Sequence, residues 1–371
     1  MTDTSPAQIT AAEIVLPARA LSPEMAFFID TLGFRLDEIY PADDPAVAVL
    51  SGHGMRIRLD RAAEQPPGHV HLRCTDPDGF AAGARRLTSP SGTTVEIIDA
   101  DPVLETPETQ HAFLVRHLRD SDAWVIGRAG MRYRDLIPDR LGGSIIASHI
   151  RIPDGGPVPD MVHFHVVGFQ LIFCLAGWVR LVYEDQGPPF VLEAGNAVIQ
   201  PPQIRHRVLE ASDNVEVLEI GVPAEHLTKI DHDMELPNGR SDPDRTWDGT
   251  RFIHFKAPEV SWGPWRLPGW EAQDTGIGAA TAGVAGVKVV RPDGTAEAGW
   301  SRHTTDILFT FVQSGEVTLD ARGTPATRLS TGDAFVVPPH LETRLSAPSA
   351  ECRLIEVALG ATFDTVPGAP A

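Results

Sequence analysis

Apolar residues along the chain gather in short runs, and turn residues separate these runs. The first sixty residues contain EIVLPA at 13–18, FRLDEIY at 34–40 and MRIRLD at 55–60, each with the length and composition of a β-strand. The chain also holds 33 glycines and 32 prolines, which interrupt helices and strands alike. We therefore expect a mainly β protein built from many short strands.

Residues 1–105 are expected to form a small α+β module. Ser22 and Pro23 stand where a helix can begin, and Gly33 stands where its apolar face ends. Strands are expected on both sides of this helix. A second, shorter pass of strand, turn, helix and strand is expected from residue 69 to residue 99, with the turn and helix in DPDGFAAGARRL at 76–87. We expect this module to serve binding or dimerisation rather than chemistry.

The order of these elements resembles the glyoxalase/bleomycin-resistance (vicinal oxygen chelate) superfamily. The residues that carry the resemblance are FFIDTLGF at 27–34, DPDGF at 76–80 and SPSGTTVEI at 89–97. In that family each half of the module tends to offer a histidine on its first strand and a glutamate on its last. The resemblance implies that His69 or His71 with Glu96 is a remnant of such a metal pair, although the first half offers Glu13 and no histidine.

An internal repeat fills most of the remaining chain. RIPDGG at 151–156 recurs as VRPDGT at 290–295, and EAGNAVIQPPQIRH at 193–206 recurs as STGDAFVVPPHLET at 330–343. Gly177 and Gly315 also correspond, so the offset between the copies stays between 137 and 139 residues. This constancy predicts two similar all-β barrels in tandem.

The repeat also sets the expected domain limits. We expect a helical connector at 106–130, a first barrel at 131–227, a linker at 228–250, a second barrel at 251–362 and a tail at 363–371. The tryptophan-rich segment SWGPWRLPGWEAQDTGIG at 261–278 is expected to strap the barrels together, with a lid over a pocket as the alternative.

Two histidines open the apolar run MVHFHVVGFQLIFCLAG at 161–177. Because strand side chains alternate in direction, His163 and His165 share one face, and Gln170 can join them after a turn. His206 lies on a later strand that can close on the pair. Three imidazoles and an amide suit a divalent first-row transition metal, and three histidines would be costly to bury among apolar residues without a common partner.

The same residues match the cupin superfamily. The spacing H-x-H-x4-[E/Q]-x6-G ends at Gly177, and the spacing G-x5-P-x4-H begins at Gly195. The resemblance implies a bicupin over about residues 130–362, made of double-stranded β-helix (jelly-roll) barrels. It also implies one divalent transition metal per chain, with Fe or Mn favoured and Ni, Zn or Cu as further options. The implied metal ligands are His163, His165, Gln170 and His206.

The second barrel keeps one of the four ligand positions. Aligned on Gly315, His303 matches His165. The other three positions hold Ser301, Leu308 and Thr343. We therefore expect this barrel to bind no metal and to buttress the first barrel or a dimer.

Other residues of the first barrel are candidates for the substrate pocket or for catalysis. The pocket candidates are Phe164, Ile172, Cys174 and Val208. The catalytic candidates are Tyr183, Glu184 and Arg180, each of which could orient an oxyanion or move a proton, or could simply be a rim residue. The catalytic residues stay undetermined at this level.

Charge and composition narrow the partners. The formal net charge is −19, and the absence of a basic block argues against nucleic acid or an anionic membrane surface as a partner. The three cysteines are far apart in sequence, which fits a reducing cytoplasm better than a disulfide framework. The polar N-terminus shows no signal-peptide pattern, and no apolar run could span a membrane. We expect a cytoplasmic homodimer whose substrate is a small oxygen-rich or anionic molecule.

Three functions are compatible with these observations. The first is a non-haem dioxygenase that cleaves a C–C bond in a small keto, enol or hydroxyaromatic compound. The second is an oxygen-independent isomerase, cyclase or lyase that uses the metal as a Lewis acid. The third is a non-catalytic small-molecule-binding cupin, since scaffold does not fix reaction.

Overall fold

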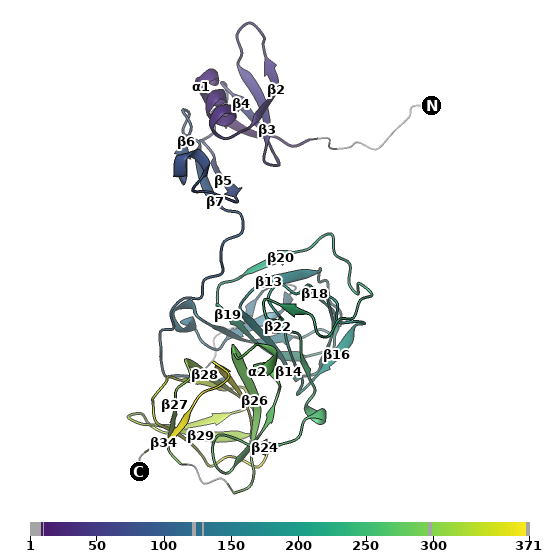
Figure 1. Ribbon diagram of the computed structural model, residues 1–371, viewed down its shortest axis with the longest axis vertical. Coiled ribbons are helices and arrows are strands. Elements are labelled where there is room, and N and C mark those ends of the chain that lie inside the picture. The colour runs from purple at the N-terminus through teal and green to yellow at the C-terminus, as the bar shows by residue number, and fades with distance from the viewer. Residues whose placement is uncertain (1–8, 10, 121–123, 128–129, 296–298, 369–371) are drawn as a thin grey trace. The chain divides into compact units, whose positions relative to one another are not determined.

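The computed structural model describes residues 9, 11–120, 124–127, 130–295 and 299–368. The chain divides into two compact units, one up to Val103 and one from Leu104 onward. Figure 1 shows the strands that make up most of both units. Each unit is described by itself.

The N-terminal unit combines two small sheets with a short helical segment at 21–31 and a 3-10 turn at Phe80–Gly83, where the second helix was expected. The first sheet has the order β1-β4-β3-β2, with β1 parallel to β4. The second sheet has the order β5-β7-β6, with β5 parallel to β7. The bounds are β1 Ile14–Pro17, α1 Leu21–Ala26, a π-helical turn at Phe27–Thr31, β2 Arg35–Tyr40, β3 Val47–Gly52, β4 Met55–Asp60, β5 His69–Cys74, β6 Arg86–Thr88 and β7 Thr94–Asp99. The helix predicted between the first two strands is confirmed.

Both sheets of this unit share one apolar core. Phe28 from the helical segment, Leu50 from β3 and Val95 from β7 are almost fully buried in the same cluster. Burial of such side chains contributes about 1.5–3 kcal/mol each, so the shorter second pass is packed as an integral part of the unit.

The first barrel consists of two antiparallel sheets. The larger has the order β23-β17-β14-β19-β11-β10-β9, and the smaller has the order β16-β15-β18-β13-β20. The bounds are β9 Val125–Ile126, β10 Arg132–Asp135, β11 Ile146–Ile152, β12 Gly156–Pro157, β13 His163–Val166, β14 Phe169–Ala176, β15 Trp178–Tyr183, β16 Phe190–Glu193, β17 Ala197–Ile199, β18 His206–Ala211, β19 Val215–Val222, β20 Leu227–Ile230 and β23 His254–Phe255. Strand β20 thus lies largely in the predicted linker at 228–250.

The second barrel repeats this arrangement. Its sheets have the orders β24-β25-β26-β33-β28-β31-β8 and β30-β29-β32-β27-β34. The bounds are β8 Leu114–Arg116, β24 Gly263–Pro264, β25 Trp270–Asp274, α2 Ile277–Ala280, β26 Ala285–Pro292, β27 Ser301–His303, β28 Ile307–Ser314, β29 Glu316–Ala321, β30 Thr327–Ser330, β31 Ala334–Val337, β32 Thr343–Ser346, β33 Arg353–Leu359 and β34 Thr365–Pro367. Strand β34 lies in the segment predicted as a tail.

The predicted equivalence of the two barrels is confirmed by strand register. His163 pairs with His206 in the first barrel, and Ser301 pairs with Thr343 in the second. Gly177 and Gly315 both begin a strand-to-strand turn with φ near +70°, a conformation that favours glycine. The repeat in sequence is therefore a repeat in structure.

The two barrels exchange edge strands. Strand β23 follows the first barrel in sequence and pairs with β17 of that barrel, whereas β8 precedes the first barrel and pairs with β31 of the second. The prediction of a helical connector at 106–130 is wrong for this reason. Its apolar residues extend along an exposed sheet edge, where a strand gains backbone hydrogen bonds that a short helix would not supply.

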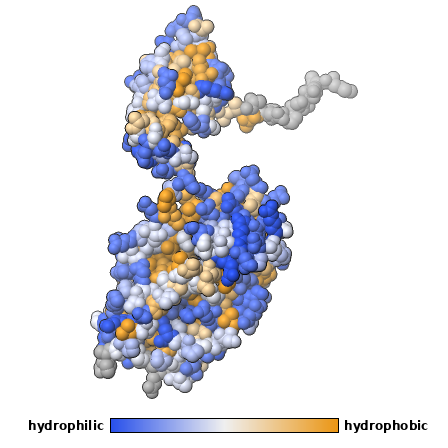
Figure 2. All heavy atoms as spheres, in the orientation of Figure 1, coloured by the Kyte–Doolittle hydropathy of each residue, from blue (hydrophilic) through white to orange (hydrophobic). Residues whose placement is uncertain are grey.

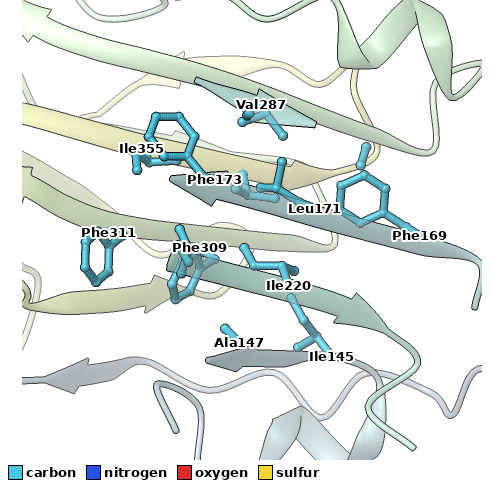
Figure 3. Packing of buried hydrophobic residues seen from close by; sticks show 14 of the residues in the cluster. Ile145, Ala147, Phe169, Leu171, Phe173, Ile220, Val287, Phe309, Phe311 and Ile355 are labelled. Atoms are coloured by element: carbon cyan, nitrogen blue, oxygen red, sulfur yellow. The ribbon is translucent and has the colours of Figure 1, made fainter. Parts of the chain in front are cut away.

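The largest apolar core lies between the barrels rather than inside either one. Phe169, Leu171 and Phe173 of β14 belong to the same cluster as Phe309 of β28 and Ile355 of β33, as Figure 3 shows. Because side chains alternate along a strand, residues 170, 172 and 174 of β14 face the opposite way, toward the interior of the first barrel.

Apolar side chains also reach the surface, among polar ones, as Figure 2 shows. Leu36 and Ile39 of β2, and Leu227 of β20, are exposed, and both strands lie at sheet edges. No helix among the described residues is long and apolar enough to cross a membrane.

Candidate metal centre in the first barrel

Three buried histidines converge inside the first barrel. His163 and His165 lie on one face of β13, and His206 lies directly opposite His163 on β18. One ligand nitrogen from each ring lies within 4.8 Å of the other two, and all three residues are buried. Such a spacing lets a single ion contact all three rings at about 2 Å from each nitrogen.

Hydrogen bonds at Nδ1 orient these rings. Nδ1 of His163 donates to the carbonyl of Met161 at 2.8 Å, and Nδ1 of His206 donates to the carbonyl of Ile204 at 3.0 Å. A carbonyl oxygen only accepts, so in the neutral imidazole the lone pair lies on Nε2. Nδ1 of His165 lies 2.9 Å from the hydroxyl of Thr228. The pattern is typical of metal-ligating histidines, whose second nitrogen is held by a neighbouring group.

The fourth predicted ligand is Gln170, whose side-chain amide is buried. Its nitrogen has a hydrogen-bond partner, and its oxygen has none among the described residues. Gln170 lies on β14 and is 1% exposed. Its Nε2 donates to Oε1 of Glu219 at 2.7 Å, whereas its Oε1 is buried and has no hydrogen-bond partner among the described residues. An unpaired buried carbonyl costs about 1–3 kcal/mol. A divalent metal within reach of this oxygen would satisfy it, so the chemistry of Gln170 fits the ion that the sequence implies, and its place as the fourth ligand stays a prediction.

A cavity of about 80 Å³ adjoins the three histidines. Its walls are mainly apolar, and the polar groups on it come from the histidines, two tyrosines, one glutamine and one glutamate. The lining residues are Met131, Tyr133, Ile150, Ile152, His163, His165, Ile172, Val179, Leu181, Tyr183, Gln200, His206, Val208, Val217 and Glu219. Ile172 and Val208 are thus placed at the cavity as expected.

Two other predicted pocket residues do not line this cavity. Phe164 alternates with the two histidines of β13, so its side chain lies on the other face of the strand, where the guanidinium of Arg205 stacks 4.1 Å from its ring centre. Cys174 is fully buried in the apolar interior, and its thiol points at the carbonyls of Ala176 and Gly177. Burial raises the pKa of this thiol to about 12, so Cys174 stays protonated at neutral pH.

The structure distinguishes the three catalytic candidates by their position relative to the cavity. Tyr183 lies opposite His206 in the sheet and lines the cavity. Glu184 accepts hydrogen bonds from Arg245 and from the backbone of Arg205, and Arg180 is half-exposed and lies 3.4 Å from Glu210. Only Tyr183 of the three lines the cavity beside the histidines.

Tyr183 is held in one orientation and keeps its proton. Its ring stacks on that of His206 at a centroid distance of 5.4 Å, and Nε2 of Gln200 donates to its hydroxyl oxygen at 3.0 Å. Burial raises the pKa of Tyr183 well above its usual value. Because the oxygen already accepts from Gln200, the phenol proton is available to donate to a bound molecule.

In the second barrel an arginine that is paired with a buried glutamate lines the equivalent cavity. This cavity measures only about 20 Å³ and is lined by Arg266 together with Ser301, His303, Leu308 and Thr343. The guanidinium of Arg266 donates to Oε2 of Glu356 from Nε at 2.8 Å and from Nη2 at 2.6 Å. The expectation that this barrel binds no metal gains a physical reason here, because a fixed cation shares the cavity with the former ligand positions.

Sequence reasoning missed Glu219 and Arg266. A signal for Glu219 was present, because VEVLEIGV at 215–222 and RLIEVAL at 353–359 place Glu219 and Glu356 at the repeat offset of 137 residues. No comparable signal marked Arg266, which lies in the segment predicted as a strap or lid. That segment instead sends Arg266 and Trp265 into the cavity of its own barrel.

The N-terminal unit also brings His69, His71 and Glu96 together. Nε2 of His71 lies 3.2 Å from the Glu96 carboxylate, and Nε2 of His69 lies 3.5 Å from it. All three side chains are partly solvent-exposed, and Arg86 lies 3.6 Å from the same carboxylate. The glutamate thus already has a cationic neighbour, in contrast to the buried cluster of the first barrel.

Comparisons with known proteins agree with this architecture. A family model described as a cupin domain matches residues 287–358, within the second barrel. A salicylate 1,2-dioxygenase from Pseudaminobacter salicylatoxidans is similar in structure with a TM-score of 0.54 and 14% identity, over 71% of this chain and 90% of that chain. A Bacillus subtilis oxalate decarboxylase, solved in work on its Mn(II) centers, has a TM-score of 0.51 and 12% identity, over 70% and 81%.

No curated protein matches the sequence significantly. The family model covers part of the second barrel, and the likeness of the N-terminal unit to glyoxalases stays a prediction. Residues 287–358 therefore match a cupin domain, and about 70% of the chain shares the fold of these two proteins. The first barrel of this fold holds a histidine triad that could bind a divalent metal.

Proposed function

We propose that the first barrel is the active site of a metal-dependent enzyme of the non-haem dioxygenase type, acting on a small keto or enol compound. The observation that carries the proposal is the convergence of three imidazoles whose Nδ1 atoms each have a hydrogen-bond partner. The expected fourth ligand is the buried amide oxygen of Gln170, which has no hydrogen-bond partner among the described residues. When bound, a divalent Fe or Mn ion would supply a Lewis acid for substrate oxygens and an electron-transfer site for O2.

The charge of the site favours a monoanionic substrate. Three imidazoles and an amide are neutral, so the ion would keep its full double positive charge toward the substrate. Glu219 is a carboxylate on the cavity wall, and the described lining residues include no lysine or arginine. An enolate that binds through two oxygens would balance this charge better than a polyanion would.

The size of the cavity favours an aliphatic compound over a hydroxyaromatic one. An apolar cavity of about 150 Å³ takes up benzene, and the cavity here measures about 80 Å³. An aromatic substrate would therefore need the walls to move. A small diketone or keto acid in its enol form needs less room.

The chain's own residues would bind and orient such a substrate. The apolar walls from Ile150, Ile172 and Val208 exclude water, which strengthens the remaining polar contacts. The Tyr183 hydroxyl, fixed by Gln200, can donate a hydrogen bond to a substrate oxygen as negative charge develops there.

An oxygen-independent isomerase or lyase is the second candidate. It is supported by Glu219, which places a carboxylate on the cavity wall where enolisation would need a proton acceptor. Substrate-dependent O2 consumption by the metal-loaded protein, measured with an oxygen electrode against small diketones and keto acids, supports the dioxygenase. Turnover under argon supports the second candidate, and tight ligand binding without turnover would leave only a binding protein.

Replacing Tyr183 with phenylalanine tests its role in either reaction. We expect kcat to fall about 100- to 1000-fold, the range for losing one oriented hydrogen-bond donor to a developing negative charge, while metal content and fold stay unchanged. Steady-state kinetics and metal analysis measure both effects. The matched control is Tyr40→Phe on the exposed strand β2, which should keep full kcat; an unchanged kcat for Tyr183→Phe would remove the tyrosine from the mechanism.

We also propose that the N-terminal unit is a glyoxalase-like module for binding or dimerisation. Its β1-α1-β2-β3-β4 order with β1 parallel to β4 supports this proposal, as do the exposed apolar residues of its edge strand β2. Light scattering on the full chain and on residues 104–371 tests it. An identical oligomeric state for both would count against a role in assembly.

A further inference from the structure

The hydrogen bond between Gln170 and Glu219 joins a predicted metal ligand to a residue that sequence reasoning did not identify. Strands β14 and β19 pair antiparallel, with Gln170 opposite Gly221 and Ile172 opposite Glu219. Gln170 and Glu219 are thus diagonal neighbours on the face that looks into the barrel. Their contact of 2.7 Å is short, as expected when the acceptor is charged.

This contact decides which end of the amide is available to an ion. The amide nitrogen lies next to Glu219 and donates to its carboxylate oxygen. The opposite orientation would place two oxygens against each other and would turn the NH2 group, which cannot bind a metal, toward the site. Glu219 therefore holds Oε1 of Gln170, the buried oxygen without a partner, in the ligand orientation.

The second barrel uses the equivalent glutamate in a related way. Glu356 lies opposite Thr310, as Glu219 lies opposite Ile172. It accepts hydrogen bonds from Arg266 and from the indole of Trp265 at 3.1 Å. In both barrels this glutamate thus accepts from a side chain that reaches into the interior, a guanidinium in one barrel and an amide in the other.

We infer that Glu219 is a positioning residue for the metal, which acts by fixing and polarising the Gln170 amide without binding the ion itself. A donor N–H that is bonded to a carboxylate increases the negative charge on the oxygen at the other end of the amide. Through this polarisation Glu219 gives the neutral ligand Gln170 part of the negative charge that a carboxylate ligand would carry. The inference rests on the proposed metal site but not on the reaction proposed for it.

A double-mutant cycle on the full-length protein tests this role, with Co(II) binding to the metal-free protein and the visible spectrum of the Co(II) form as readouts. The variants are Glu219→Gln, Gln170→Glu and the swap that combines both. We expect Glu219→Gln to weaken Co(II) binding about 10- to 100-fold, the range for residues that orient a ligand. The swap restores a carboxylate ligand held by an amide, so it should bind Co(II) at least as tightly as the unmodified protein.

The control is Glu193→Gln on β16, which removes the same charge from an exposed position of this barrel. It should leave the affinity and the spectrum unchanged. Thermal unfolding of the metal-free variants checks that each is folded.

The outcomes separate this inference from the metal site itself. Non-additive effects of at least about tenfold, with the swap restoring binding, support the positioning role. Independent effects of the two substitutions on Co(II) affinity would overturn it. It would also be overturned if the spectrum of Glu219→Gln showed the loss of a ligand while that of Gln170→Ala did not change, because Glu219 would then be the ligand. Absence of Co(II) binding in the unmodified protein would overturn both the metal site and this inference.

Discussion

Replacing His206 with alanine is expected to abolish metal binding and activity while the chain stays folded. The substitution removes one of three imidazoles that converge within 4.8 Å, so the loss of affinity should exceed the about 10- to 100-fold caused by disturbing groups behind the ligands. The fold should persist because the main core, between the barrels, does not include His206. Metal analysis of untagged protein and circular dichroism measure both outcomes.

The matched control for this substitution is His303→Ala. His303 is the residue of the second barrel that corresponds to His165. Its Nε2 donates a hydrogen bond to the carbonyl of Val337 at 3.0 Å. We expect this variant to keep the metal. Full metal occupancy in His206→Ala, or loss of metal in His303→Ala alone, would contradict the assignment of the site to the first barrel.

The second large effect is expected for Arg266→Ala in the second barrel. The substitution would leave the carboxylate of Glu356, a residue 3% exposed, without the guanidinium that donates two hydrogen bonds to its Oε2. Breaking a buried ion pair from one side typically costs about 3–5 kcal/mol. Urea unfolding followed by tryptophan fluorescence should therefore show a large loss of stability, since Trp265 and Trp270 lie in this cavity's apolar cluster.

Two comparison variants make this result interpretable. Replacing both partners with apolar residues, as Arg266→Met with Glu356→Leu, should recover much of the stability because no uncompensated charge remains. Arg328→Ala removes a partner of Glu316 at the surface and should cost at most about 1 kcal/mol. If Arg266→Ala were no more destabilising than Arg328→Ala, the ion pair between Arg266 and Glu356 would not contribute to the stability of the second barrel.

The barrels and the histidine cluster could be predicted because each depends on short-range patterns. Alternation along β13 places His163 and His165 on one face whatever the rest of the fold does. Because the repeat offset is nearly constant, each strand predicted in one barrel predicts a matching strand in the other. The pairing of His163 with His206 and of Ser301 with Thr343 agrees with this match.

The remaining features depend on contacts between residues far apart in the chain. Whether Gln170 meets Glu219 is decided by the register of β14 against β19, and a shift of one residue would turn either side chain to the other face. Strand β8 exists only because β31, more than 200 residues later, offers it an edge. The role of Arg266 likewise depends on a cavity formed by strands that follow it in the sequence.

An anomalous difference map from crystals of the untagged, metal-loaded protein tests the central claim most directly. The account predicts one metal peak per chain, inside the first barrel, bound by Nε2 of the three histidines and by Oε1 of Gln170, with Glu219 on the far side of the amide. A peak in the second barrel at Ser301 and His303, a metal bound through Nδ1, or no peak among the three histidines would contradict it.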